Sequence, residues 1–125
     1  MTAVQVLVVD DEGELVSALA ERLGLRGFDA QGATSGTAAL AYLAERRFDV
    51  VLVDVKMPGL GGLELVRTIK ARWPAQAVVL LTGHTSAEDA AAGAALGVSG
   101  YLLKPVDIEE LSAALRAAAP NQVEP

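Results

Sequence analysis

An α/β domain with a parallel sheet is the fold class that the sequence predicts, and three observations support it. Short runs of valine, leucine and other strand-forming residues occur five times along the chain, each followed by a helical pattern. The runs are nearly continuously apolar, as in a parallel sheet with helices on both faces. The 125 residues, 52% of them hydrophobic, suffice for one domain with a buried core. Five strand–helix repeats predict an open sheet with right-handed crossovers.

The expected strands differ in strength. Four of them are rich in valine and leucine. The strand near Phe28 contains fewer apolar residues, so its strand signal is weaker. In chain order, the expected strands are Val4–Val9, Phe28–Gln31, Val50–Val53, Ala77–Leu81 and Tyr101–Leu103.

Helical periodicity and stop signals predict the first three helices. Leucines recur every four residues between positions 15 and 23, and Gly24 or Gly27 ends that helix. The second helix starts after Ser35. The third has an apolar face that reaches Trp73 and stops at Pro74. We expect Trp73 to pack at the helix end rather than to bind a ligand.

Capping residues predict the last two helices. Thr85 and Glu88 have the spacing of a capping box, and Gly97 ends the fourth helix. That helix offers little apolar volume, and Gly93 in its middle costs about 1 kcal/mol relative to alanine, so we expect it to be marginally held. Asp107 opens the fifth helix, with Glu110 three residues later.

Composition excludes several classes of function. The net charge of -6 gives no basic patch for nucleic acid, and the absence of cysteine excludes disulfides and thiolate chemistry. We expect no signal peptide, because the first apolar run meets Asp10 at once, and the longest low-polarity stretch, residues 90–98, is too short to span a membrane. We therefore expect a cytoplasmic protein that binds neither nucleic acid nor membrane directly. The folded domain is expected over residues 1–119, with a loose tail or the start of a linker over residues 120–125.

Polar side chains follow four of the expected strands. Asp10 and Asp11 follow the first strand, Asp54 the third, Thr82 the fourth and Lys104 the fifth. Ligands of open α/β sheets bind at the carboxyl ends of the strands, so these residues form the candidate site. Each alone has a plainer interpretation as a solvated strand end or a turn residue. Their joint placement favours a site.

Three crowded carboxylates predict a bound cation. Like charges are unfavourable together unless they are protonated or neutralised, and Mg²⁺ suits carboxylates, water and phosphate. With one lysine and one Mg²⁺, the formal charges of the site sum to zero. A carboxylate can serve as a covalent nucleophile, and phosphoryl transfer requires mainly positioning and charge stabilisation. The residues therefore predict phosphoryl transfer onto a carboxylate.

Four segments resemble the receiver domain of two-component response regulators, the CheY-like family. They are VLVVDDE (6–12), VLVDVKMPG (51–59), LLTGH (80–84) and GYLLKP (100–105), and the resemblance extends from Val4 to Ala118. It implies a flavodoxin-like, doubly wound fold, with a five-stranded parallel sheet in the order 2-1-3-4-5 flanked by five helices.

The resemblance also implies roles for the site residues. Asp54 would accept a phosphoryl group from a sensor histidine kinase or a phosphotransfer protein. Asp11 and Asp54 would ligate Mg²⁺ directly, Asp10 through water, and Lys56 through its backbone carbonyl. Lys104 would pair with the phosphoryl group. The domain would be no enzyme in the ordinary sense, since it would catalyse only its own phosphorylation and dephosphorylation.

A conformational switch is part of the same resemblance. Thr82 would turn its hydroxyl to the phosphoryl group, and Tyr101 would turn into the space left behind. The bond before Pro105 would be cis. The surface of the fourth helix, fifth strand and fifth helix would then change and be read by an effector protein or a covalently linked output domain. A phosphorylation-dependent homodimer is left open, as is a stand-alone domain against a piece of a longer regulator.

Two places invite comment. Gly61 stands where many relatives carry aspartate, so the third helix is expected to lack a side-chain N-cap at a cost of a few tenths of a kcal/mol. His84 is either a solvent-facing loop residue or, with Lys56, flanks the water that hydrolyses the acyl phosphate.

Other function classes fit the residues less well. A haloacid-dehalogenase-like phosphatase needs a second aspartate two residues after its nucleophile, where this chain has Glu12 and Lys56. A flavodoxin-type binding module needs a phosphate-cradling loop after the first strand, where this chain is acidic. A degenerate receiver that serves only in protein interaction would not need every key residue, and all are present.

Overall fold

The structure, a computed structural model, describes residues 3–57, 61–83 and 87–120. Its centre is a five-stranded, wholly parallel sheet in the order β2-β1-β3-β4-β5. The fold class expected from the sequence is confirmed, including the strand order that the family resemblance implied. The strands are β1 (Gln5–Val9), β2 (Asp29–Ala33), β3 (Val50–Asp54), β4 (Val78–Thr82) and β5 (Gly100–Leu103).

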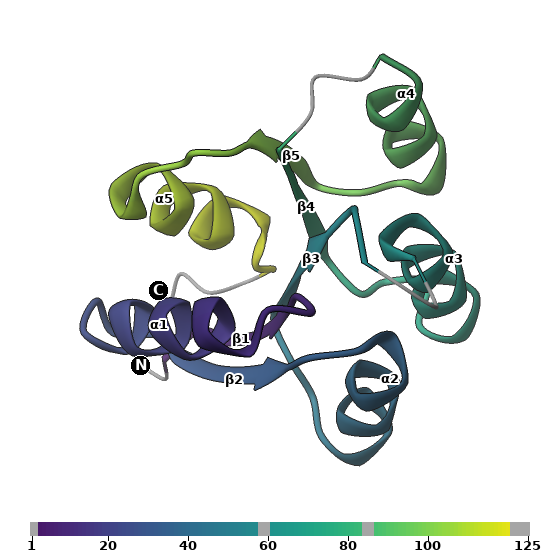
Figure 1. The fold of residues 1–125 in the computed structure, drawn as a ribbon. Coiled ribbons are helices and arrows are strands. Elements are labelled where there is room, and N and C mark those ends of the chain that lie inside the picture. The colour runs from purple at the N-terminus through teal and green to yellow at the C-terminus, as the bar shows by residue number, and fades with distance from the viewer. Residues whose placement is uncertain (1–2, 58–60, 84–86, 121–125) are drawn as a thin grey trace.

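Five helices cover the two faces of the sheet. Figure 1 shows α1 and α5 on one face and α2, α3 and α4 on the other. The strands alternate between the two faces, so neighbouring residues such as Val8 and Val9 belong to different core clusters. This is why the strand runs are continuously apolar. The helices are α1 (Gly13–Gly24), α2 (Gly36–Glu45), α3 (Gly62–Arg72), α4 (Ala87–Leu96) and α5 (Ile108–Ala118).

The expected caps explain where several helices begin and end. The Ser35 hydroxyl accepts a hydrogen bond from the backbone N–H of Ala38 at 3.0 Å, and the Asp107 carboxylate accepts one from the N–H of Glu110 at 2.7 Å. The helix α1 ends at Gly24, whereas Gly27, with φ of 89°, turns the chain into β2. The expected capping box at Thr85 lies outside the described residues.

Strand ends differ from the expectation by one or two residues. The strands β3 and β4 include Asp54 and Thr82, because both residues still pair with the neighbouring strand. The weak strand β2 lies at Asp29–Ala33, further along the chain than expected, because its pairing with the apolar strand β1 sets its register.

The helix α4 approaches the sheet closely at Gly93. A Cβ atom at this buried position would lie 2.8 Å from Cδ1 of Leu80 and 3.4 Å from Cγ2 of Val98. The glycine therefore has a packing role on β4, beyond the helix-propensity cost that the sequence showed. The helix ends as expected, at Gly97 with φ of 83°.

Candidate functional site

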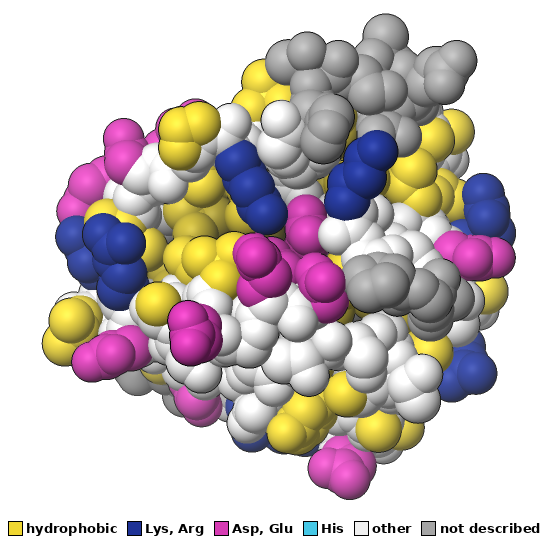
Figure 2. All heavy atoms as spheres, in the orientation of Figure 1, with side chains coloured by type: hydrophobic (Ala, Val, Ile, Leu, Met, Phe, Trp, Pro, Cys, Tyr) yellow, Lys and Arg dark blue, Asp and Glu magenta, His cyan; other side chains and the backbone are white. Residues whose placement is uncertain are grey.

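Strand register brings the acidic residues together. In the β1–β3 pair, Val9 lies opposite Val53, so the next residues, Asp10 and Asp54, lie side by side where the strands end. One carboxylate oxygen from each of Asp10, Asp11 and Asp54 lies within 4.8 Å of the other two. Figure 2 shows acidic side chains gathered at the centre of this face, with basic side chains beside them. We call these three residues the acidic cluster.

The acidic cluster is buried on its inner side and open on its outer side. Asp10 and Asp54 are only 2% and 6% exposed, whereas Asp11 is exposed to solvent. A ligand can therefore reach the cluster from the Asp11 side, while the two inner carboxylates are largely withdrawn from water.

Lys104 joins the acidic cluster from β5. Its Nζ lies 3.6 Å from Oδ2 of Asp10 and 3.5 Å from Oδ1 of Asp54. Its backbone N–H donates to the carbonyl of Thr82 at 2.7 Å, so pairing between β4 and β5 sets the position of the lysine. The peptide bond between Lys104 and Pro105 is cis, as the family resemblance implied.

Both inner carboxylates hold their protons more tightly than usual. Burial raises the pKa of Asp54 above its ordinary value, and the nearby charge of Asp10 raises it further, while Lys104 and the backbone of Lys56 oppose the shift. Burial likewise raises the pKa of Asp10, opposed by the backbone N–H of Glu12 and by Lys104. The charged forms of these groups are therefore short of stabilising partners.

The oxygen donors of the acidic cluster fit a divalent cation. Oδ1 of Asp10 accepts a hydrogen bond from the N–H of Glu12 at 3.1 Å, but its buried Oδ2 has no hydrogen-bond donor among the described residues. The three carboxylates and Lys104 carry a formal charge of -2, which a divalent cation would balance. Oxygen ligands of this kind suit a hard cation.

Thr82 and Tyr101 lie on neighbouring strands beside the acidic cluster. Thr82 is fully buried at the end of β4, and Tyr101 lies opposite Leu80 in the β4–β5 pair. The Tyr101 ring packs against the core cluster on the α3 and α4 side of the sheet. Its hydroxyl is buried and has no hydrogen-bond partner in the part of the chain that the structure describes.

The other residues singled out in the sequence lie around the acidic cluster or outside the described residues. Lys56 is exposed two residues after Asp54, and only its backbone bears on the carboxylate of Asp54. His84 lies outside the described residues, so neither interpretation of it is tested. The expectation that α3 lacks a side-chain N-cap is confirmed, because its N-cap is Gly61.

Gly62 is a residue of the site that the sequence analysis missed. Its N–H donates to the carbonyl of Val55 at 3.1 Å, and a Cβ atom here would lie 2.7 Å from Cα and 2.8 Å from O of Val55, and closer still to the carbonyl of Asp54. The start of α3 thus rests directly on the backbone of Asp54. The Gly61–Gly62 pair was the available signal, but the contact needs the fold.

Comparison with known proteins decides the family. Residues 6–116 match the family described as the response regulator receiver domain. The chain belongs to this family. Receiver domains are signalling domains of two-component response regulators, and the structural neighbours include CheY-like proteins.

Individual relatives of the receiver domain agree with this assignment. The chain is 37% identical over 113 residues to the uncharacterized transcriptional regulatory protein YkoG of Bacillus subtilis, covering 90% of this chain and 50% of that protein. The chemotaxis protein CheY4 of Vibrio cholerae matches with a TM-score of 0.88 and 32% identity, covering 94% of this chain and 99% of that one.

A third relative is described in a modified state. A response regulator protein from Burkholderia pseudomallei, described with a phosphorylated aspartic acid, calcium ion and citrate, matches with a TM-score of 0.81 and 30% identity, covering 88% of this chain and 65% of that one.

Two further findings set the context of the receiver domain. The chain spans about half the length of the first curated relatives that it matches, among them transcriptional regulatory proteins. Within the described ranges, none of the helices has both the length and the apolar character that crossing a bilayer requires.

Proposed function

We propose that this receiver domain accepts a phosphoryl group on Asp54, in a Mg²⁺-dependent reaction with the phosphohistidine of a sensor kinase or phosphotransfer protein. The observation that carries the proposal is the meeting of three carboxylates within 4.8 Å, with the Lys104 ammonium 3.5 Å from Asp54. The Burkholderia relative described with a phosphorylated aspartic acid supports it.

Asp54 is the nucleophile in this proposal because of its place in the site. It ends the central strand β3, between Asp10 on one side and the β4 strand on the other, and its Oδ1 faces Lys104. A carboxylate oxygen forms a bond to phosphorus as the phosphorus–nitrogen bond of the phosphohistidine breaks. The imidazole nitrogen keeps the electron pair of that bond. With the other ring nitrogen protonated, the leaving group is neutral imidazole, so charge and atoms balance without a further reactant.

The residues divide the remaining work. Asp11, Asp54 and the carbonyl of Lys56 would hold Mg²⁺ directly, and Asp10 would hold it through water. The ion would supply positive charge for the transferring oxygens and the carboxylates. Lys104 would pair with another phosphoryl oxygen, and Thr82 would donate a hydrogen bond to a third. The raised pKa values of Asp10 and Asp54 support a role for the cation, because the site lacks enough positive charge of its own. The domain would catalyse only its own phosphorylation and dephosphorylation.

The switch proposal concerns Thr82 and Tyr101. Reorientation of the Thr82 hydroxyl toward the phosphoryl group would open space for the Tyr101 ring. The Tyr101 hydroxyl is buried without a hydrogen-bond partner among the described residues, and such a group costs about 1–3 kcal/mol that access to water would relieve. This supports a second, more exposed position of the ring. The surface of α4, β5 and α5 would change and be read by a partner.

The partners follow from the same scheme. The reader of the switched surface would be an effector protein or a covalently linked output domain, as the transcriptional regulators among the relatives suggest, or a second phosphorylated copy. The receiver domain would span residues 1–119, with residues 120–125 as a tail or the start of a linker. A cytoplasmic location would fit a kinase partner.

Intact-mass measurement after incubation with acetyl phosphate and Mg²⁺ tests the proposal. We expect one added phosphoryl group that is labile to base, lost in Asp54→Asn, and retained in the matched control Asp29→Asn, which removes an exposed carboxylate on β2. Labelling that persists in Asp54→Asn would assign the phosphoacceptor to another residue.

A further inference from the structure

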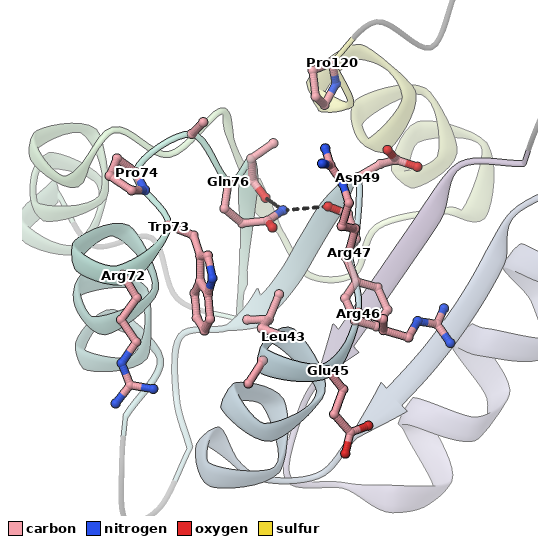
Figure 3. A pocket seen from close by; sticks show the side chains of 14 residues that line it. Leu43, Glu45, Arg46, Arg47, Asp49, Arg72, Trp73, Pro74, Gln76 and Pro120 are labelled. Carbon is pink, nitrogen blue, oxygen red and sulfur yellow. Dashed lines mark hydrogen bonds between the residues drawn. The ribbon is translucent and has the colours of Figure 1, made fainter.

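A groove of about 630 Å³ opens at the end of the sheet opposite the acidic cluster. The loop from α2 to β3 forms one wall, and the loop from α3 to β4 forms the other. Asp49 lies at the groove and Asp54 at the site, and β3 between them spans about 17 Å at about 3.3 Å per residue. We call this opening the Trp73 groove. Figure 3 shows its lining, with Pro120 at the upper rim.

A hydrogen bond from the Gln76 side chain joins the two walls of the Trp73 groove. Nε2 of Gln76 donates to the carbonyl of Phe48 and to that of Ala77, both at 3.2 Å, and Figure 3 shows the side chain between the walls. Nζ of Lys70 donates to the carbonyl of Gln76 at 2.6 Å. These bonds fix the position of Gln76, which lies between the two walls.

Trp73 gives one wall its apolar surface. It is the only tryptophan of the chain and is half-buried at the end of α3, where its inner side packs on the core as expected. In Figure 3 its indole faces Leu43, while the guanidinium groups of Arg72 and Arg47 point away from the ring. A partly exposed indole is typical of binding surfaces, because tryptophan is enriched at the energetic centres of interfaces.

Three arginines line the Trp73 groove, and they are not equivalent. Arg46 stacks over the Phe48 ring at 4.5 Å, its Nη2 donates to Oε1 of Gln5 at 3.3 Å, and the same Nη2 lies 4.0 Å from Oδ2 of Asp29 in an ion pair. Arg47 and Arg72 are exposed, and neither makes an ion pair or a hydrogen bond with any described residue. Two positive charges are thus available to a partner.

The charge of the Trp73 groove also contrasts with that of the molecule. The lining has three arginines against Glu45 and Asp49, which leaves a net charge of +1 in a chain of net charge -6. The Asp49 carboxylate keeps its negative charge, and its Oδ2 accepts a hydrogen bond from the backbone N–H of Gln5 at 2.8 Å. An acidic ligand would find its electrostatic complement here and repulsion over much of the remaining surface.

We propose that the Trp73 groove binds an acidic peptide segment of a partner protein. An apolar side chain of the peptide would lie on Trp73, and a neighbouring carboxylate would pair with Arg47, with Arg72 at the outer rim. Because the groove and the acidic cluster lie at opposite ends of the sheet, this partner can stay bound while a phosphodonor approaches Asp54. The proposal does not depend on phosphoryl transfer.

Fluorescence of the single tryptophan reports directly on the Trp73 groove. The probe is the blocked peptide acetyl-Glu-Leu-Glu-Leu-Glu-amide, and acetyl-Lys-Leu-Lys-Leu-Lys-amide is its basic counterpart. We expect a saturable change in Trp73 emission with the acidic peptide, and weaker binding by at least tenfold with the basic one. Added salt should weaken the binding of the acidic peptide, since exposed charges are screened.

Arginine variants locate the contact. Arg47→Ala should lower the affinity for the acidic peptide at least fivefold, and Arg72→Ala should lower it at least twofold. Arg67→Ala, which removes an exposed arginine elsewhere on α3, should leave binding unchanged. Labelling by acetyl phosphate should be the same in all three variants, and this shows that they fold and separates the groove from the phosphorylation site.

Other results would overturn the proposal. These are no saturable emission change, equal binding of the two peptides, or an equal effect of Arg47→Ala and Arg67→Ala. A change in Trp73 emission on raising the protein concentration alone would assign the groove to a second copy. The same change on deleting residues 121–125 would assign it to the chain itself.

Discussion

Asp10 and Asp54 show how single residues set the chemistry of this receiver domain. Strand pairing forces two carboxylates side by side with one lysine between them, and burial raises the pKa of both. A raised pKa means that the folded protein favours the protonated carboxyl more than the unfolded chain does. Without a divalent cation, stability is therefore gained as the pH falls through the raised pKa, and lost as the pH rises through it.

The raised pKa of Asp54 gives a prediction for the Asp54→Asn variant in the absence of divalent cations. At neutral pH the variant should be more stable than the wild type, because it removes a buried charge whose pKa is raised. The difference should shrink as the pH falls toward 4, since the wild-type carboxyl then takes up its proton. Urea unfolding across this pH range measures the free energy of unfolding of both. A variant that is less stable than the wild type at neutral pH would contradict the account.

Two adjacent glycines give a matched pair of variants. Gly62→Ala places a Cβ against the backbone of Asp54 and Val55, so it should cost about 1–3 kcal/mol and slow labelling of Asp54 by acetyl phosphate. Gly61→Ser meets open space at the N-cap and should stabilise the domain by a few tenths of a kcal/mol, with labelling unchanged.

Thermal unfolding and the labelling rate check both glycine variants. If Gly62→Ala lost stability but labelled at the wild-type rate, Gly62 would support the fold without positioning Asp54.

Among the helices, we expect α4 to be held least firmly. Gly93 lowers its helix propensity, and the small side chains at positions 90–92 and 94–95 give it little apolar surface, although the same glycine brings it close to Leu80. The helix α3, in contrast, buries Leu65, Val66 and Ile69. We therefore expect α4, the helix next to Tyr101, to move at the lowest cost in free energy.

Amide hydrogen exchange tests this difference between the helices. Amides of α4 should exchange at least tenfold faster than those of α3, since fewer buried contacts resist local opening. Phosphorylation should change exchange in α4 and β5 more than in α3. Equal protection of α3 and α4 would show that α4 is not marginally held.

Some features of the fold and the site could be predicted from the sequence, and others could not. Continuous apolar strands and the residues after them were readable, because each depends on a short segment, and so were Ser35 and Asp107 as caps. The strand order came only through the family resemblance, since it depends on pairing between distant segments. The contacts at Gly62 and Gly93 and the Trp73 groove were missed for the same reason. The sequence contains the Arg46–Arg47 and Trp73–Pro74 pairs, but it does not show that the fold brings them to the same groove.

Across the whole molecule, the parallel sheet separates two surfaces of opposite character. The carboxyl ends of the strands carry the acidic cluster with Lys104, and the opposite end carries the Trp73 groove with the exposed Arg47 and Arg72. In a chain of net charge -6, the first surface is acidic and the Trp73 groove is a local exception. One small domain can thus present one end to a phosphodonor and the other to an acidic partner.

The requirement for a cation at the acidic cluster is the central claim, and calorimetric titration with Mg²⁺ at neutral pH tests it most directly. We expect one ion to bind per chain, with affinity reduced at least tenfold in Asp11→Asn and in Asp54→Asn, and unchanged in Asp29→Asn. A wild-type protein that takes up no Mg²⁺, or binds it equally well in all these variants, would contradict the account.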